Sequence, residues 1–259
     1  IMGRYNFDKI VDRKHTKSLK YDFAAQRGKP ADVLPFWVAD MDFEIPSELK
    51  QVLLDRVNHG IFGYTESDDA YFNVLKEWFA SRFNWNIDKK WLVKTPGVVF
   101  ALAMAVRSFT KEGEGVLINQ PVYYPFSMVI DDNNRNLINV PLIQGEDRYT
   151  IDFEGVERAI IEHNVTLFLL CNPHNPVGRV WTEEELKRLG DICIKHNVII
   201  ISDEIHADFV WDGHKHTVFA NLGESYAEHC IVCTAPSKSF NIAGLQVSNI
   251  FIPNDSLRR

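Results

Sequence analysis

The sequence lacks the features that would point to a partner with a strong negative charge or to a membrane. Its 28 Lys and Arg residues are scattered and are outnumbered by 35 Asp and Glu, which gives a net charge of −7 and disfavours nucleic acid and anionic lipid as ligands. No apolar run approaches the roughly 20 residues of a transmembrane helix, and the first residues contain no signal-peptide core. We therefore expect a cytoplasmic protein that binds neither nucleic acid nor membranes.

Cysteine is scarce, with four residues in 259. Cys230 and Cys233 have the C-x-x-C spacing of redox and metal motifs, which require both thiols on one side of a turn. This pair instead lies in an apolar run typical of a strand, where residues three apart point to opposite faces. The sequence therefore predicts buried thiols and no metal site.

A second motif is also missing, because no Gly-x-Gly-x-x-Gly follows a predicted strand. Gly113 and Gly115 do not complete one, which disfavours a nicotinamide-dependent enzyme.

What the sequence contains is a regular alternation of short apolar runs with amphipathic segments. Helices are predicted at 46–59, 69–83, 99–109, 152–163 and 182–196, and strands at 116–119, 165–171, 198–202, 230–234 and 246–252. Thr182 and Glu185 form a capping box. This order predicts an α/β fold with three layers, in which helices cover both faces of a mostly parallel (mixed) sheet. Residues 1–45 are predicted to be irregular, and the chain ends soon after a strand with no closing helix, which is typical of a fragment.

Polar residues follow three of the predicted strands. Asn175, Asp203 and Lys238 each come a few residues after a strand ends, and the carboxyl ends of parallel strands form the ligand-binding edge of such sheets. Gly97 precedes a helix whose free backbone N–H groups suit a phosphate.

These residue types match the needs of pyridoxal 5′-phosphate (PLP), which requires an amine, a carboxylate for its pyridine nitrogen, a donor to its phenolic oxygen, a flat stacking group and an anion cradle. The candidates, in that order, are Lys238, Asp203, Asn175, Tyr123, and the Gly97 turn with Ser237. Each has an ordinary alternative: a solvated lysine, a helix N-cap, a turn former, or a core aromatic. Only their joint position at successive strand ends favours the cofactor.

The motifs also resemble those of a known family, the fold-type I PLP enzymes of aminotransferase classes I and II. The resemblance extends from about Tyr5 to Ile252 and rests on Pro-Gly-Val-Val, Pro-Val-Tyr, Asn-Pro-His-Asn-Pro-x-Gly-Arg, Ser-Asp-Glu-Ile-His and Ser-Lys-x-Phe-Asn-x-x-Gly-Leu. The segment 35–43 and the Ser-Asp-Glu-Ile-His motif are similar to the branch of cystathionine β-lyases and C–S lyases.

The resemblance implies a role for each matching residue. Lys238 would be the Schiff-base lysine, Asp203 would pair with the pyridine nitrogen, and Tyr123 would stack on the ring. Asn175 and His206 would flank the phenolic oxygen. The phosphate would be bound by the set Val98, Val99, Ser237 and, from the neighbouring subunit of a homodimer, Tyr64.

The resemblance further implies a domain organisation with residues 1–45 as an N-terminal segment of the small domain and active-site entrance, and 46–259 as the large PLP-binding domain. The C-terminal part of the small domain, with the arginine that binds the substrate carboxylate, would be absent. The sequence also departs from many aminotransferases, because 244–246 reads Gly-Leu-Gln where they carry a phosphate-binding arginine.

The predicted function is a PLP-dependent C–S β-lyase that converts a sulfur-containing amino acid to a thiol, pyruvate and ammonia. An aminotransferase is the alternative, because it uses the same residues. A different class of function, a catalytically impaired fragment or regulatory binding protein with this fold, is favoured only by the early chain end.

Overall fold

The computed structural model describes residues 5–259, so the first four residues of the predicted segment 1–45 lie outside the described part. The chain forms two compact units. The first contains residues up to Thr65 together with Pro236–Leu245, and the second contains Glu66–Ala235 and Gln246–Arg259. The predicted domain border at residue 45 concerns a complete two-domain molecule and stays a prediction.

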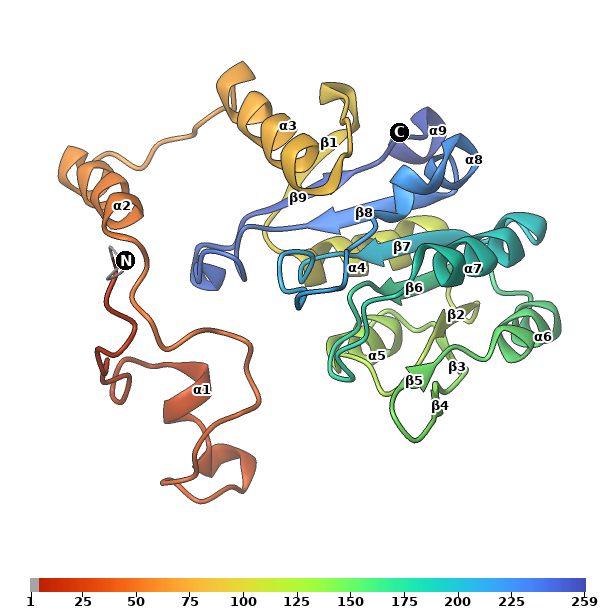
Figure 1. The fold of residues 1–259 in the computed structure, drawn as a ribbon, viewed down its shortest axis with the longest axis horizontal. Coiled ribbons are helices and arrows are strands. Elements are labelled where there is room, and N and C mark those ends of the chain that lie inside the picture. The colour runs from red at the N-terminus through yellow and green to blue at the C-terminus, as the bar shows by residue number, and fades with distance from the viewer. Residues whose placement is uncertain (1–4) are drawn as a thin grey trace. The chain divides into compact units, whose positions relative to one another are not determined.

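The second unit is built on a seven-stranded sheet with the order β1-β9-β8-β7-β6-β2-β3 (Figure 1). β9 runs antiparallel to both of its neighbours, and all other neighbours are parallel. The predicted mixed, mostly parallel sheet is therefore confirmed. Its strands are β1 (Leu92–Thr95), β2 (Gly115–Ile118), β3 (Asn136–Asn139), β6 (Leu167–Cys171), β7 (Ile199–Asp203), β8 (Cys230–Thr234) and β9 (Ser248–Phe251).

Helices cover both faces of this sheet, because the central strands are apolar on both sides. One core cluster joins the sheet to α4 (Val98–Phe109) and α5 (Pro125–Asp131). The other joins it to α3 (Asp69–Phe83), α6 (Phe153–His163) and α7 (Glu183–Lys195). Successive strand residues alternate between the clusters, as the two-residue period of a strand requires.

The same alternation places the two cysteines of β8 on opposite faces of the sheet. Cys230 belongs to one core cluster and Cys233 to the other, and both thiols are free and buried. Burial raises the pKa of each thiol well above its usual value. The predicted burial of the two thiols is therefore confirmed, and a thiol of raised pKa is a poor nucleophile.

The long helices begin where the sequence places their caps. The Glu185 amide donates to Thr182 Oγ1 at 3.2 Å and the Thr182 amide donates to Glu185 Oε2 at 2.8 Å, which closes the predicted capping box of α7. Asp152 caps α6 by accepting from the Gly155 amide at 2.9 Å.

Several shorter elements do not appear among the sequence predictions. β1 and β3 are missed because both are short, and most of their residues are partly exposed. A four-residue helix, α9 (Asp255–Arg258), follows β9, although no closing helix is expected from the sequence. The remaining elements are β4 (Ile143–Gln144), β5 (Tyr149–Thr150), α8 (Glu224–Ala227) and the 3-10 helices η2 (Lys89–Trp91) and η3 (Phe219–Leu222).

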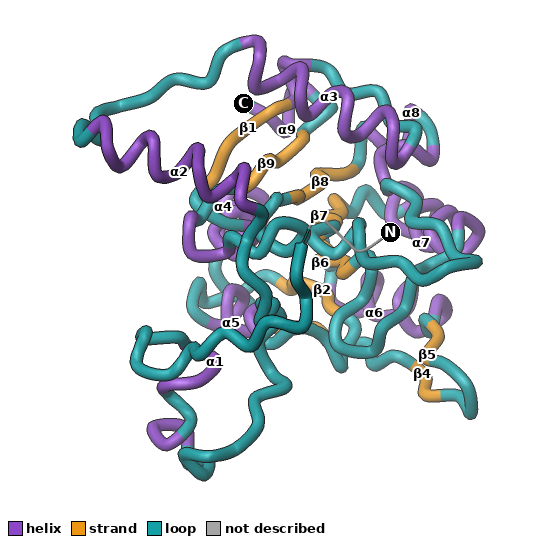
Figure 2. The backbone as a smooth tube through the Cα atoms, turned by 60° about the vertical axis from the view of Figure 1, so that its left-hand side comes forward, coloured by secondary structure: helices purple, strands orange, loops and turns teal. Residues whose placement is uncertain are grey.

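The first unit is mainly loop, as predicted for the N-terminal segment (Figure 2). It contains α1 (Leu19–Asp22), α2 (Ser47–His59) and the 3-10 helices η1 (Ala25–Arg27) and η4 (Ala243–Leu245). All 13 residues of α2 are at least partly exposed. Within residues 5–259, none of the helices has the length and apolar character needed to cross a bilayer.

Candidate cofactor site

One edge of the sheet in the second unit gathers the carboxyl ends of six strands. β2, β3, β6, β7 and β8 are mutually parallel, and β1 shares their direction because β9 is antiparallel to both β1 and β8. The predicted residues of this unit follow these ends: Gly97, Val98 and Val99 after β1, Tyr123 after β2, Asn175 after β6, and Asp203 and His206 at the end of β7. Because this edge is the ligand-binding edge of parallel sheets, the fold brings them to one place.

Asp203 occupies the centre of this edge. It is the last residue of β7, it is buried, and it pairs across the sheet with Cys171 on β6 and Cys233 on β8. Its Oδ1 accepts from the Ile205 amide at 3.2 Å. The chain then enters turns at 205–208 rather than a helix, so Asp203 does not cap a helix.

The loop after β6 is held close to Asp203 through Cys171. The Asn172 amide donates to the Asp203 carbonyl at 2.9 Å, and the Asn175 amide donates to Cys171 Sγ at 3.3 Å. Burial, followed by the charge of Asp203, raises the pKa of the Cys171 thiol. Cys171 is therefore a neutral packing group that helps to fix the loop carrying Asn175.

Tyr123 lies within the electric field of Asp203. Its ring is partly exposed, and its pKa is raised by burial first and then by Tyr124 and Asp203. The rings of Tyr123 and Tyr124 meet edge to face at 5.4 Å between centroids. Tyr123 therefore offers a neutral aromatic face at the same edge as the Asp203 carboxylate.

The N-terminus of α4 supplies an anion cradle. Gly97 has φ +106°, and a Cβ added there would meet nothing within 4 Å. The backbone conformation at this position therefore requires glycine, because residues with a side chain rarely adopt it. Since Gly97 has no side chain to cap the helix, the first N–H groups of α4, including those of Val98 and Val99, can face an anion.

A buried carboxylate beside Asp203 is not among the residues predicted from the sequence. Glu204 Oε1 accepts from Ser202 Oγ at 2.8 Å and from the Phe219 amide at 2.9 Å, and its Oε2 lies 2.8 Å from His216 Nε2. The Glu204 and His216 side chains are each 1% exposed. These bonds close the loop that carries His206, whose ring packs edge to face on Phe209 at 6.1 Å. The signal in the sequence that indicates such a group is a carboxylate placed directly after an apolar strand.

The remaining candidates, Ser237, Lys238 and Tyr64, belong to the first unit. Lys238 is partly exposed and lies four residues after β8, on the turn that begins at Pro236. Ser237 is buried, and its carbonyl accepts from the Ile242 amide at 3.0 Å. Tyr64 is fully exposed on the segment between α2 and α3.

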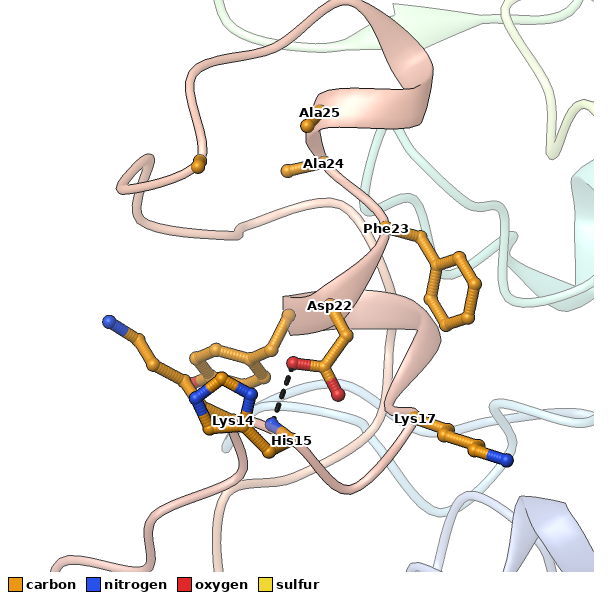
Figure 3. A pocket seen from close by; sticks show the side chains of 9 residues that line it. Lys14, His15, Lys17, Asp22, Phe23, Ala24 and Ala25 are labelled. Atoms are coloured by element: carbon orange, nitrogen blue, oxygen red, sulfur yellow. Dashed lines mark hydrogen bonds between the residues drawn. The ribbon is translucent and has the colours of Figure 1, made fainter.

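The first unit also contains a separate cavity of about 440 Å³ (Figure 3). Lys14, His15, Lys17 and Asp22 are among the residues that line it, and Asp22 Oδ1 accepts from the His15 amide at 2.9 Å. A second backbone donor, the Ser18 amide, reaches Asp22 Oδ2 at 3.1 Å. The carboxylate thus fixes the loop, and none of the predicted cofactor residues lines this cavity.

The donor set at the sheet edge fits PLP. A buried carboxylate, a neutral aromatic ring beside it and an uncapped helix N-terminus are the fixed groups that a pyridine nitrogen, an aromatic ring and a phosphate require. The glycine cradle is open, because nothing lies where its side chain would project.

The chain belongs to the aminotransferase class I and II family, which residues 31–259 match. Cystathionine β-lyase PatB of Bacillus subtilis (strain 168) is 46% identical to it over 254 residues, which cover 98% of this chain and 65% of that protein.

Two solved structures share the fold at high similarity. Cystalysin from Treponema denticola, whose structure contains PLP, superposes with a TM-score of 0.92 at 42% identity and covers 98% of this chain and 65% of its own. The PLP-bound C–S lyase from Staphylococcus hominis superposes with a TM-score of 0.93 at 37% identity, covering 99% and 65%. The chain thus spans about 65% of the length of these relatives.

Proposed function

We propose that the protein is a PLP-dependent C–S β-lyase that cleaves a sulfur-containing amino acid to a thiol, pyruvate and ammonia. The observation that carries the proposal is the buried Asp203 carboxylate at the centre of the sheet edge, an edge that also carries Tyr123 and the uncapped N-terminus of α4. The 46% identity to a cystathionine β-lyase supports the choice of reaction.

The residues of this chain would bind and orient the cofactor as follows. The negative charge of Asp203 favours the protonated form of the pyridine nitrogen, because an opposite charge nearby stabilises a cation. Asn175 and His206 would donate to the phenolic oxygen, and Tyr123 would stack on the ring. The phosphate would lie against the set Gly97, Val98, Val99 and Ser237.

Lys238 would serve both as the covalent anchor and as the base. When bound, PLP supplies an electron sink for the charge that develops on the substrate Cα. The amine of Lys238, once released from the cofactor, would take the Cα proton, and cleavage of the Cβ–S bond would follow. The partly exposed position of Lys238 leaves its side chain accessible to a substrate.

An aminotransferase is the alternative, because it would use the same residues up to the removal of the Cα proton and then return a proton to the cofactor carbon. A turnover assay on cystathionine separates the two. The lyase predicts release of pyruvate and a thiol without an added keto acid. A half-reaction that depends on a keto acid, with no pyruvate from cystathionine, would support the aminotransferase. A dimer loaded with PLP that performs neither reaction would support the regulatory binding role.

We also propose that the protein works as a homodimer in which Tyr64 reaches the phosphate of the partner's site. The full exposure of Tyr64 and the exposed apolar side chains of the neighbouring Ile61 and Phe62 support this assembly. Sedimentation of the full chain tests it. The cytoplasmic location stays a prediction.

A further inference from the structure

We propose that Asn241 is a positioning residue for Lys238, whose side-chain amide clamps the lysine turn onto the main chain of residues 41–43. The inference rests on the proposed function, because it assumes that Lys238 anchors the cofactor. All the contacts that carry it lie within the first unit.

The Asn241 amide makes three hydrogen bonds to the main chain about 200 residues away. Its Oδ1 accepts from the Met41 amide at 3.0 Å, while its Nδ2 donates to the carbonyls of Met41 at 3.0 Å and Phe43 at 2.9 Å. Both donors of the Nδ2 group are used, and the carbonyl oxygen is paired. Because hydrogen bonds are directional, these three bonds fix the position of the lysine turn relative to residues 41–43.

The lysine turn is held to Asn241 by its own backbone. The backbone N–H of Asn241 donates to the Lys238 carbonyl at 3.4 Å, and the backbone N–H of Ile242 donates to the Ser237 carbonyl at 3.0 Å. Asn241 itself has φ +55°, a left-handed conformation that asparagine tolerates better than other residues with a side chain. The side-chain amide of Asn241, which is bonded to residues 41–43, therefore fixes the position of the Lys238 backbone three residues earlier.

The segment that receives the clamp is itself fixed by a network of charges. Arg13 donates to both carboxylate oxygens of Asp40, at 2.7 and 3.1 Å, and to Asp42 at 2.7 Å. Lys20, whose side chain is 8% exposed, donates to the Asp40 carbonyl at 3.0 Å and to Asp42 Oδ2 at 2.9 Å. Arg13 also donates to the Met41 carbonyl at 3.3 Å, the same oxygen that accepts from Asn241 Nδ2. Arg13 and Lys20 thus fix the segment that Asn241 binds.

A clamp on the lysine turn matters because the chemistry depends on where the amine can reach. The lysine side chain has four flexible carbons, so only the backbone restricts its starting point. A misplacement of about 1 Å in a reacting group can cost roughly 100-fold in rate. Asn241 touches neither the substrate nor the cofactor in this scheme and acts through Lys238.

The test compares Asn241→Asp with the wild-type full chain. The substitution keeps the shape but removes the two donors and sets a carboxylate against two carbonyl oxygens. The matched control is Asn164→Asp, because Asn164 is also left-handed, with φ +48°, and ends helix α6 in the other unit.

Two readouts follow the lysine directly: the fraction of Lys238 that carries a pyridoxyl group after brief borohydride reduction, and the pH at which the visible absorbance of the bound cofactor titrates. The loss of two hydrogen bonds of about 1 kcal/mol each should lower the equilibrium constant for the clamped position of the lysine turn roughly 30-fold. We expect Asn241→Asp to lower the labelled fraction at limiting cofactor and to shift the titration, while Asn164→Asp changes neither.

The outcomes separate this inference from the proposed function. A wild-type chain that never labels at Lys238 contradicts the proposed function. Labelling and titration that are equal in wild type and Asn241→Asp overturn the clamp alone. If Asn241→Asp fails to fold, Asn241→Gly keeps the left-handed backbone and loses all three bonds, and it should show the same two changes. Unchanged readouts in that variant would also overturn the clamp.

Discussion

Replacing Glu204 with alanine should destabilise the large unit and disturb the strand end that carries Asp203. The Glu204 carboxylate is buried and accepts from the Ser202 hydroxyl, the Phe219 amide and His216 Nε2. Removing it leaves three buried donors without an acceptor, in a place that water cannot easily reach.

The expected loss follows from these contacts. Breaking one side of a buried, hydrogen-bonded pair costs about 3–5 kcal/mol, because the partner's polar groups remain desolvated. For a unit of this size, about 3 °C of melting temperature corresponds to each kcal/mol, so we expect Glu204→Ala to melt roughly 10 °C lower.

Urea and thermal unfolding of the full chain, followed by circular dichroism, measure this effect. Glu162→Ala is the control, because Glu162 is exposed on helix α6 and should change the unfolding free energy by less than about 0.5 kcal/mol. A Glu204→Ala chain that unfolds within 1 kcal/mol of wild type would refute the claim that this network holds the loop after β7.

Three further predictions concern individual groups. Burial lowers the pKa of His174 from 6.5 to about 4, so the unfolded chain binds the extra proton first. This group costs about 3 kcal/mol of stability as the pH falls from about 6.5 to about 4, and His174→Phe should flatten that slope in urea titrations. In Gly97→Ala, a side chain at φ +106° adds about 1–2 kcal/mol of strain. Relief of this strain should move the first N–H groups of α4 away from the phosphate and weaken PLP binding about ten-fold, measured by cofactor fluorescence. Asp203→Asn keeps the shape but removes the charge, and should lower turnover roughly 10- to 1000-fold.

Each of these has a result that contradicts it. An unchanged slope of stability with pH in His174→Phe would mean that another group titrates in that range. Gly113→Ala, at φ +81° on the turn before β2, pays similar strain and should leave PLP affinity intact; an equal loss in both variants would place the Gly97 effect in general stability. Full turnover by Asp203→Asn would show that its charge is not needed.

The sequence predicts the central sheet because the buried strands are apolar on both faces. β6, β7 and β8 are apolar runs bounded by polar residues, and helices α6 and α7 begin at recognisable caps. β1 and β3 were missed because most of their residues are partly exposed, so neither gives a continuous apolar run.

The candidate site likewise contains some residues that the sequence predicts and others that it does not. The residues that follow strand ends, such as Asp203 and Asn175, were predictable because parallel strands end at one edge. Contacts over long sequence distances were not. Glu204 bonds to Phe219 across an irregular loop, and Asn241 bonds to Met41 at a separation of 200 residues. Neither pair leaves a periodic pattern in the chain.

Peptide mapping by mass spectrometry after borohydride reduction shows whether Lys238 anchors PLP. We expect a pyridoxyl-phosphate mass on the peptide that contains Lys238 and its loss in Lys238→Ala. A protein that gains no such mass with PLP in excess, or gains it on another lysine, would show that Lys238 is not the anchor.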